Sequence, residues 1–365
     1  MRRAIELARR GAGWTSPNPL VGAVIVHDGR IIGEGWHEKC GGPHAERNAL
    51  AHLTESAAGA TICVTLEPCC HHGRQPPCTD AILEHGLARV VIGSRDPNPL
   101  VAGKGAAILR AHGVEVVEDF LRDECDALNP IFFHYITTRR PYVTMKYAMT
   151  ADGKIATATG ASKWITGERA RAHVQTLRHR HRAILAGIGT VLADDPLLNC
   201  RMEGGRQPVR VVCDSRLRLP LNSQLVRTAR DFPTLAVCAQ ADPAKRAALE
   251  QAGVEVLELP GADGRVDLSA LLDALGAREI DSILVEGGAA IHGALLTAGL
   301  VDHVCCYLAP KLFGGEAAKS PVGGPGVAVP ADALALGAPQ ITRLGGDLLL
   351  EYDVQKGEPP CSPAL

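Results

Sequence analysis

The sequence of 365 residues contains few aromatic side chains and no excess of charge of either sign. Aromatic residues make up 4%, and the formal net charge is −2 at pH 7. A protein that binds nucleic acid over a broad surface needs basic patches and aromatic rings on which bases stack. These two shortages exclude an extended nucleic-acid surface, although small basic pockets remain compatible with the composition.

Long apolar runs are also missing. No stretch of about 18 apolar residues occurs, so we expect no membrane-spanning helix and no membrane partner. Residues 1–7 have an amphipathic pattern that carries charges throughout and lacks the apolar centre of a secretion signal. We therefore expect a cytoplasmic protein, and we interpret its 12 cysteines as reduced thiols and metal ligands rather than disulfides.

Length and patterning predict two α/β domains. The chain exceeds the usual size of one domain, and short apolar strand patterns alternate with helical patterns in both halves. A polar stretch that ends in a proline, residues 137–141, marks the boundary. The predicted domains are therefore 1–140 and 141–357, followed by a disordered tail at 358–365.

The individual elements are read from apolar periodicity and turn residues. In the first domain we predict a hairpin of strands 21–27 and 30–35, strands at 61–66, 88–93 and 114–117, and helices at 2–11, 43–53, 79–85 and 105–111. In the second we predict strands at 142–147, 183–187, 209–214, 234–238, 254–257, 283–286, 338–344 and 347–353. Its helices are expected at 167–180, 243–252, 268–276 and directly after 287–288, with a loop at 319–331.

Four residues of the first half have the pattern of a catalytic metal site. His44 and Glu46 stand at the start of a predicted helix, Cys69 follows a predicted strand, and Cys78 comes nine positions later. Catalytic zinc uses three protein ligands and keeps one position for water, and H-x-E followed by P-C and a further cysteine is the zinc-deaminase signature. We predict one zinc per chain, with His44, Cys69 and Cys78 as ligands and Glu46 as the proton carrier.

Several alternatives remain for this cluster. The residues could be a buried structural cysteine pair near an exposed histidine, and Cys40 or Cys70 could be confused with the ligands. Cys70 adjoins Cys69 and could bind the metal in its place, although neighbouring residues of a turn rarely aim at one ion. A purely structural zinc would need a fourth protein ligand, which His71 or His72 could supply. The carboxylate of Glu46 beside His44 favours catalysis over a structural role.

The first half resembles the family of bifunctional riboflavin-biosynthesis deaminase-reductases. The eight residues between the two cysteine ligands, where most zinc deaminases have two, are typical of this branch. One departure is Cys70, at a position where the family usually has serine. The matching strings are Pro17-Asn18-Pro19, His44-Ala45-Glu46, Thr65-Leu66-Glu67-Pro68-Cys69, His71-His72-Gly73-Arg74-Gln75-Pro76-Pro77-Cys78 and Asp96-Pro97-Asn98-Pro99.

The resemblance implies a cytidine-deaminase-like αβα layered fold for this half. It also implies that Asn18, His37, Asp96 and Asn98 contact the pyrimidine or its ribose, and that Arg74 and Gln75 approach the 5′-phosphate. The alternative for Asn18 and Asn98 is turn chemistry beside proline. For Arg74 the alternative is a solvated cation on a loop.

The second half contains a Gly-Gly pair between a predicted strand and a predicted helix. Glu286 ends the strand, and backbone N–H groups at Gly287-Gly288 could approach a phosphate at the helix start. There is no G-x-G-x-x-G fingerprint, and simple turn chemistry explains the pair equally well. Three further strings resemble the reductase half of the same family, whose fold is similar to dihydrofolate reductase: residues 146–156, Ser162-Lys163-Trp164-Ile165-Thr166 and 190–196.

The two resemblances together cover the chain to about Tyr352. The second implies a substrate site that contains Lys146, Ser162, Arg178, Arg201 and Glu286. The NADPH site it implies is lined by Ala148, Trp164, Thr190, Asp194, Leu198, Ser215, Gly288, Ala289, Ala290, Ile291, His292, Gly293 and Ala294.

Each of these positions also has a simpler interpretation. Trp164 could be a core aromatic residue, Arg178 one charge of a basic helix face, and Asp194-Asp195 a helix cap.

The implied function is two successive reactions on a small pyrimidine ribose-phosphate. Zinc-activated hydroxide removes an amine from 2,5-diamino-6-ribosylamino-4(3H)-pyrimidinone 5′-phosphate. NADPH then reduces C1′ of the ring-opened ribose to give 5-amino-6-ribitylaminouracil 5′-phosphate. The resemblance also implies a homo-oligomer assembled through the reductase domain. The rival hypothesis, a deaminase that edits nucleic acid, predicts a basic and aromatic-rich second half, which the composition does not provide.

Overall fold

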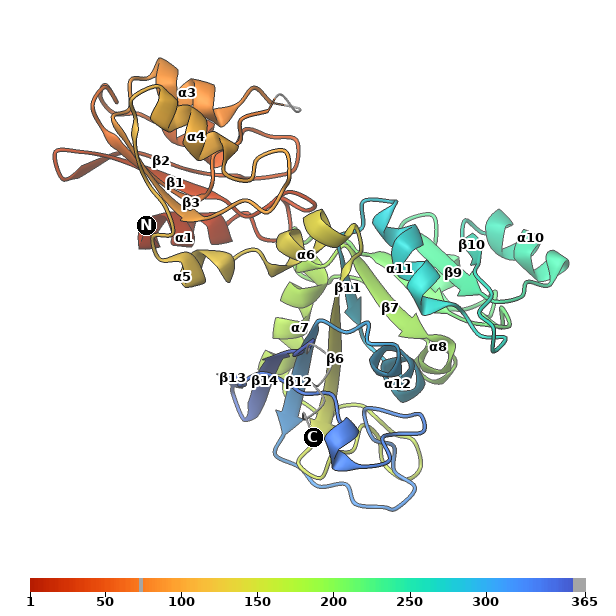
Figure 1. Cartoon of the computed structure of the whole chain (residues 1–365). Helices are drawn as coiled ribbons and strands as arrows, with labels where there is room; N and C mark the ends of the chain where they lie inside the picture. Colours follow the sequence, from red (N-terminus) through yellow and green to blue (C-terminus); the bar gives the residue numbers. More distant parts are fainter. Residues whose placement is uncertain (72–74, 357–365) are drawn as a thin grey trace, which may run out of the picture. The chain divides into compact units, whose positions relative to one another are not determined.

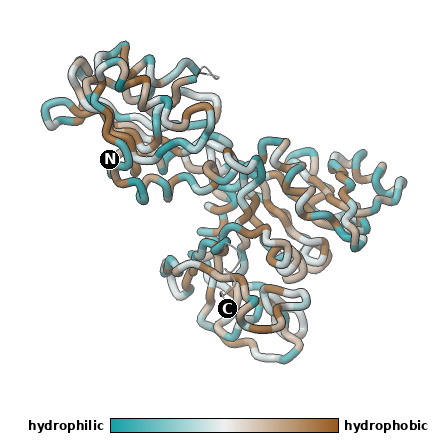
Figure 2. The backbone as a smooth tube through the Cα atoms, viewed as in Figure 1, coloured by the Kyte–Doolittle hydropathy of each residue, from teal (hydrophilic) through white to brown (hydrophobic). Residues whose placement is uncertain are grey.

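The computed structural model describes residues 1–71 and 75–356 of the chain, so Arg74, His72 and the predicted tail lie outside the described residues. The chain divides into two compact units, Met1–Arg139 and a second that begins at Arg140 (Figure 1). Each unit has its own sheet and its own hydrophobic core, and in Figure 2 the hydrophobic segments of each unit follow its strands. No helix among the described residues is long and apolar enough to cross a membrane.

The first unit contains a five-stranded sheet with the order β2-β1-β3-β4-β5. The hairpin strands β1 (Gly22–His27) and β2 (Arg30–Trp36) are antiparallel, and β1 is also antiparallel to β3 (Thr61–Leu66). The strands β3, β4 (Arg89–Ser94) and β5 (Glu115–Val117) are parallel. The loops that follow β3 and β4 therefore leave the sheet at the same edge.

Helices cover both faces of this sheet because its strands are apolar on both sides. Ala23 and Ile25 pack into the core shared with α2 (Ala45–Ala51), α3 (Cys78–Glu84) and α4 (Lys104–Ala111). Val24, which points to the opposite face, packs against α1 (Arg2–Arg9). The short α5 (Arg122–Asp126) packs with α1, and α6 (Pro130–Thr138) ends the unit. This arrangement confirms the αβα layered fold.

The second unit contains a nine-stranded sheet with the order β10-β9-β8-β7-β11-β6-β12-β14-β13. The strands from β10 to β12 run parallel, and β14 and β13 continue the sheet antiparallel. Their bounds are β6 (Tyr142–Thr150), β7 (Ala183–Gly187), β8 (Val209–Cys213), β9 (Thr234–Cys238), β10 (Glu255–Glu258), β11 (Ser282–Val285), β12 (His303–Ala309), β13 (Gln340–Leu344) and β14 (Asp347–Asp353).

Helices of the second unit pack on this sheet around three core clusters. The longest, α7 (Glu168–Arg180), buries Val174 and Leu177 against β11, β12 and β14. The others are α8 (Ile188–Asp194), α9 (Gln224–Arg227), α10 (Pro243–Gln251), α11 (Leu268–Gly276) and α12 (Ala289–Thr297), with a 3₁₀ turn at Pro330–Asp332. A mostly parallel sheet between helices agrees with the predicted α/β fold of this half.

The structure also contains elements that sequence analysis did not predict. The strand β12 lies inside the large sheet, between β6 and β14. Four helices also occupy segments for which no element was predicted: α5, α6, α8 and α9. The polar stretch at the predicted boundary is partly helical: α6 continues through Thr138, and the hydroxyls of Thr137 and Thr138 donate to the carbonyls of Phe133 and His134. The predicted hairpin and the strands of residues 61–66, 183–187 and 347–353 are confirmed.

Candidate functional site

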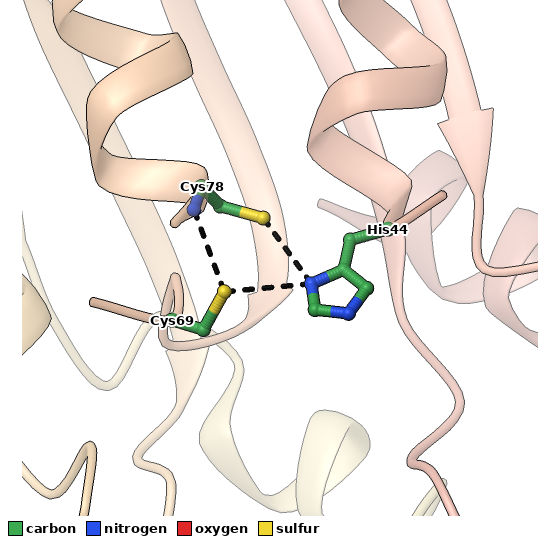
Figure 3. A group of neighbouring side chains, drawn as sticks. All are labelled: His44, Cys69 and Cys78. Carbon is green, nitrogen blue, oxygen red and sulfur yellow. Dashed lines mark hydrogen bonds between the residues drawn. The ribbon is translucent and has the colours of Figure 1, made fainter. Parts of the chain in front are cut away.

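Three short connections bring the predicted metal ligands together in the first unit. His44 is the N-cap residue of α2, Cys78 is the first residue of α3, and Cys69 lies in the turn after β3. The backbone N–H groups of Cys78 and Thr79 donate to the carbonyl of Cys69, which ties the turn to the start of α3. In Figure 3 the imidazole and both sulfur atoms point toward one another.

The donor atoms have a spacing that suits zinc. The Nδ1 atom of His44 lies 3.4 Å from Sγ of Cys69 and 3.3 Å from Sγ of Cys78. With bonds of about 2.0 Å to nitrogen and about 2.3 Å to sulfur, tetrahedral zinc holds such donors about 3.5 Å apart. Two thiols and one imidazole are also the donor types that zinc prefers. The residues present therefore fit a zinc ion.

Glu46 is buried next to these donors. It lies in the first turn of α2, its exposed fraction is 3%, and its carboxylate accepts a hydrogen bond from Cys78. Burial raises the pKa of this carboxyl to about 7. A carboxyl that changes its protonation state near neutral pH can both accept and donate a proton. Its place at the start of a helix also favours the negative charge.

Asn18 is half-buried and pairs with the buried ring of His37, which lies beside His44. The Nδ1 atom of His37 lies 2.9 Å from the carbonyl oxygen of Pro43, and burial lowers the pKa of the ring. A neutral ring that donates through Nδ1–H leaves Nε2 free to accept from the amide of Asn18, 3.2 Å away. The rings of His37 and His44 meet edge to face at 5.5 Å between centroids. Asn18 thus bonds a side chain of the site rather than only its own turn.

Asp96 and Asn98 lie in the loop after β4. Asp96 is buried and accepts from the backbone N–H of Asn98, and Asn98 in turn accepts from Leu100. Burial raises the pKa of Asp96 to about 6. Both side chains thus accept hydrogen bonds from the backbone of their own turn. This agrees with the alternative interpretation of Asn98, that it stabilises a turn beside proline. The amide of Gln75 lies 3.5 Å from the carbonyl oxygen of Gly41.

The alternative ligands are not part of the donor cluster among the described residues. The thiol of Cys70 donates to the carbonyl of Leu100 at 3.7 Å. Nδ1 of His71 is buried without a hydrogen-bond partner, and the ring is not among the clustered donors. His72 lies outside the described residues.

Glu67 is a buried carboxylate of this region to which sequence analysis gave no role. It accepts from the backbone N–H groups of Gly103 and Ala106 and so holds the start of α4 near the turn that carries Cys69. The sequence shows that Glu67 stands between a buried strand and Pro68-Cys69. It does not show the hydrogen-bond donors of Glu67, which lie 36 and 39 residues away along the chain.

In the second unit Arg178 and Glu286 form a buried ion pair. The two nitrogens Nε and Nη2 of Arg178 lie 2.6 Å and 2.8 Å from the carboxylate oxygens of Glu286. Their side chains are 10% and 9% exposed, so Arg178 is not a charge on a solvated helix face. Burial acts to raise the pKa of Glu286, but Arg178, with smaller contributions from Lys146 and Arg201, lowers it to about 2.

Lys146 lies close to this pair. Its ammonium group is 5.5 Å from the centre of the Tyr307 ring, whose hydroxyl lies 2.8 Å from Nδ1 of His173. Burial lowers the pKa of Lys146, while Glu286 acts to raise it. The structure thus brings Lys146, Arg178 and Glu286 together, whereas Ser162 is half-buried on a separate loop. Tyr307 and His173 had not been singled out, since β12 was not predicted.

The Gly-Gly turn joins β11 to α12 and faces Thr190. Gly287 has a φ of +111°, which favours glycine, and a Cβ atom on Gly288 would lie 3.2 Å from the hydroxyl of Thr190. Gly288 is the N-cap residue of α12 and Ala289 its first residue. Ile291, His292 and Gly293 are buried, and Nδ1 of His292 lies 2.9 Å from the carbonyl oxygen of Pro321. A side chain at either glycine would thus be strained or crowded, so the turn favours glycine at both positions.

The remaining residues expected at the cofactor have varied surroundings. Trp164 is 61% exposed with the guanidinium of Arg171 over its ring, so it is not a core residue. Leu198 is buried in the core, and Ser215 accepts from the backbone N–H of Val266. Asp194 is exposed at the end of α8, and Ala148 is half-buried on β6.

Comparisons with known proteins agree with both units. A family model of the cytidine and deoxycytidylate deaminase zinc-binding region matches residues 1–94, and the model of the RibD C-terminal domain matches residues 141–350. Fold and site thus define a two-domain enzyme that joins a zinc-binding deaminase to a reductase. The chain is 58% identical to the riboflavin biosynthesis protein RibD of Actinobacillus pleuropneumoniae, over 97% of this chain and 94% of that protein. It belongs to the RibD family of bifunctional riboflavin-biosynthesis enzymes.

Other relatives give the same result. The chain is 42% identical to RibD of Escherichia coli K12, over 96% of this chain and 97% of that protein. A crystal form of Acinetobacter baumannii RibD has a TM-score of 0.86 and 40% identity, covering 97% of this chain and 98% of that one. The deaminase/reductase of Thermotoga maritima has a TM-score of 0.84 and 39% identity, covering 97% of both chains.

Proposed function

We propose that His44, Cys69 and Cys78 hold the catalytic zinc and that Glu46 moves protons during deamination of 2,5-diamino-6-ribosylamino-4(3H)-pyrimidinone 5′-phosphate. The observation that carries this proposal is the buried carboxylate beside three clustered donors of the types that zinc prefers. Zinc, when bound, supplies the Lewis acidity that activates a water molecule. The carboxylate of Glu46 takes a proton from that water and returns a proton to the departing amine.

The substrate base is proposed to bind against Asn18, His37, Asp96 and Asn98. The pair of Asn18 and His37 supports this, because the ring of His37 lies next to His44 and both side chains are already fixed by hydrogen bonds. A ligand site gains affinity when its polar groups are held in place before binding. Gln75 and Arg74 are proposed to hold the 5′-phosphate.

In the second unit we propose that Lys146, Ser162, Arg178, Arg201 and Glu286 bind the deaminated product. The proximity of Lys146, Arg178 and Glu286 supports this, because it places charged donors and a carboxylate near one another for ribose and phosphate groups. NADPH, when bound, supplies the hydride that reduces C1′ of the ribose. It is proposed to lie along Ala148, Trp164, Thr190, Asp194, Leu198, Ser215, Gly288, Ala289, Ala290, Ile291, His292, Gly293 and Ala294.

The domains proposed for the two reactions are residues 1–140 and 141–357. We also propose a homo-oligomer assembled through the reductase domain. Exposed apolar side chains on that domain support it, since a subunit interface would remove them from water: Leu312, Val327, Val329, Leu334, Leu336 and Ile341. A cytoplasmic location is supported by the free thiols of Cys69 and Cys78, which need a reducing compartment to bind metal.

The substitution Glu46→Gln tests the deaminase assignment. It keeps the shape of the side chain but removes the proton carrier, so ammonia release should fall by at least about 10²-fold. Zinc content should stay at one per chain, and reduction of separately supplied deaminated product should be unchanged. Unchanged ammonia release, or activity only on cytosine in RNA, would overturn the assignment.

The reductase assignment is tested with Trp164→Ala. Loss of the exposed indole should raise KM for NADPH with the deaminated product as substrate, and ammonia release should be unaffected. A KM for NADPH equal to that of the unmodified enzyme contradicts a role for Trp164 in the cofactor site.

A further inference from the structure

His303, Cys305 and Glu351 bring an imidazole, a thiol and a carboxylate together in the second unit. His303 and Cys305 are two positions apart on β12 and so face the same side of the sheet. Glu351 on β14 is the cross-strand partner of Cys305. The three donor atoms lie within 4.8 Å of one another, and neither proposed reaction uses them.

The spacing of the three donors is close to that around a metal ion. Oε1 of Glu351 lies 3.8 Å from Nε2 of His303 and 3.8 Å from Sγ of Cys305. Nitrogen, oxygen and sulfur donors around zinc are about 3.4–3.6 Å apart. Small rotations of these side chains would close the set around one ion.

A second observation concerns the orientation of His303. Its Nδ1 atom lies 2.8 Å from Oδ1 of Asp353, so Nδ1–H can donate to that carboxylate. A histidine that binds a metal commonly donates its other ring N–H to a carboxylate in this way. Asp353 thereby fixes the tautomer in which Nε2, the nitrogen nearest Glu351, carries the free lone pair.

Two carboxylates of β14, those of Glu351 and Asp353, contact the ring of His303. Arg180 and His173 of α7 also face Glu351, and Lys146 of β6 faces Cys305. The side chains of His303 and Glu351 are 21% and 27% exposed, which leaves an ion a route in.

We propose that His303, Cys305 and Glu351 form a second zinc site, with Asp353 as the residue that orients His303. One imidazole, one thiolate and one carboxylate suit zinc, whereas magnesium and calcium prefer oxygen donors alone. The site is separate from the centre at His44, Cys69 and Cys78.

The second site lies next to the reductase machinery. In the parallel pairing of β12 with β6, the partner of Cys305 is Lys146. A bound dication places positive charge beside the Lys146 ammonium and should hinder its contact with substrate. Zinc at this site is therefore an inhibitor of the reductase reaction. This consequence rests on the proposed role of Lys146, whereas zinc binding itself does not.

The test counts zinc on the full-length enzyme whose deaminase zinc is in place. The protein is equilibrated with buffered micromolar free zinc, separated from it by gel filtration, and analysed by mass spectrometry of the metal. The unmodified chain should carry two zinc ions, and Cys305→Ser or Glu351→Gln should carry one, with ammonia release unchanged. Cys306→Ser is the matched control, because Cys306 is the next residue of β12 and faces the opposite side. It should keep two.

Cobalt gives a spectroscopic check, since thiolate bound to cobalt produces a charge-transfer absorption. A second such signal should appear in the unmodified chain and be missing in Cys305→Ser. One zinc per chain in the unmodified protein, or two zinc ions retained in both Cys305→Ser and Glu351→Gln, overturns the site. NADPH oxidation should be severalfold slower at two zinc ions than at one, and independent of added zinc in Cys305→Ser. An unchanged rate at two zinc ions contradicts the link to Lys146.

Discussion

The two candidate sites are built in opposite ways. The deaminase site is local: its three metal donors and Glu46 come from 35 residues of chain, on one turn and the starts of two helices. The reductase site draws Lys146, Arg178 and Glu286 from β6, α7 and the end of β11. The deaminase site depends on one small group of neighbouring residues, and the reductase site depends on the packing of a whole sheet. Substitutions in the first should therefore abolish chemistry, and those in the second should also reduce stability.

The largest effect is expected for Cys69→Ala. Loss of one of three protein ligands should remove the zinc and reduce ammonia release by at least about 10³-fold, because no other group activates the water. Reduction of supplied deaminated product should continue. Metal content and the two separate activity assays measure this, and retention of one zinc with full deamination contradicts the assigned ligand set.

A large loss of stability is expected for Arg178→Met. The substitution leaves the carboxylate of Glu286 buried without its partner, which costs about 3–5 kcal/mol. Urea unfolding of the second unit, followed separately from zinc release by the first, measures the change. Arg246→Met removes an exposed pair with Glu250 and is the control, with an expected cost of less than about 1 kcal/mol. If the two substitutions lowered the free energy of unfolding equally, the distinction between a locally built deaminase site and a reductase site that depends on packing would be wrong.

The same ion pair predicts a pH dependence of stability. Arg178 lowers the pKa of Glu286 from its ordinary 4.5 to about 2, so the unfolded chain binds a proton more readily than the folded one. The pair therefore contributes fully above pH 4.5, by roughly 3 kcal/mol, and loses this contribution as the pH falls toward 2. The stability difference between the unmodified chain and Glu286→Gln should shrink over this range. A difference that stays constant from pH 6 to pH 3 contradicts the prediction.

A smaller effect is expected for Gly293→Ala in α12. A Cβ atom there would lie 2.0 Å from the carbonyl oxygen of Gly323, so the backbone must shift at a cost of about 1–3 kcal/mol. Gly189→Ala in α8 meets no atom within 4 Å and is the matched control. The first variant should unfold at a lower temperature and show a raised KM for NADPH. The second should unfold no earlier than the unmodified chain, since alanine favours a helix over glycine, and should keep its KM.

The difference between the two sites also explains what could be predicted from the sequence. The metal site comes from a short stretch of sequence whose spacing is itself the signature of a zinc site. The convergence of His44, Glu46, Cys69 and Cys78 could therefore be expected from the residues alone. The pairing of Arg178 with Glu286 joins positions 108 apart and depends on the order of strands in the sheet, which no local pattern encodes.

The strand β12 shows most clearly what local sequence patterns do not predict. Residues 303–309 are largely buried on both faces, so they lack the alternation of polar and apolar residues that marks a half-exposed strand. Because this strand was not predicted, Tyr307 and the cluster of His303 and Cys305 could not be placed. Their partners on β6 and β14 became visible only from the strand register.

The central claim is that one chain carries out two reactions in sequence at separate sites. The most direct measurement is anaerobic incubation of the zinc-loaded enzyme with the diaminopyrimidine ribose-phosphate, with and without NADPH, while both products and ammonia are followed. We predict ammonia and the deaminated ribosyl compound without NADPH, and the ribityl compound only when NADPH is present. Formation of the ribityl compound without ammonia, or no ammonia under either condition, would contradict the account.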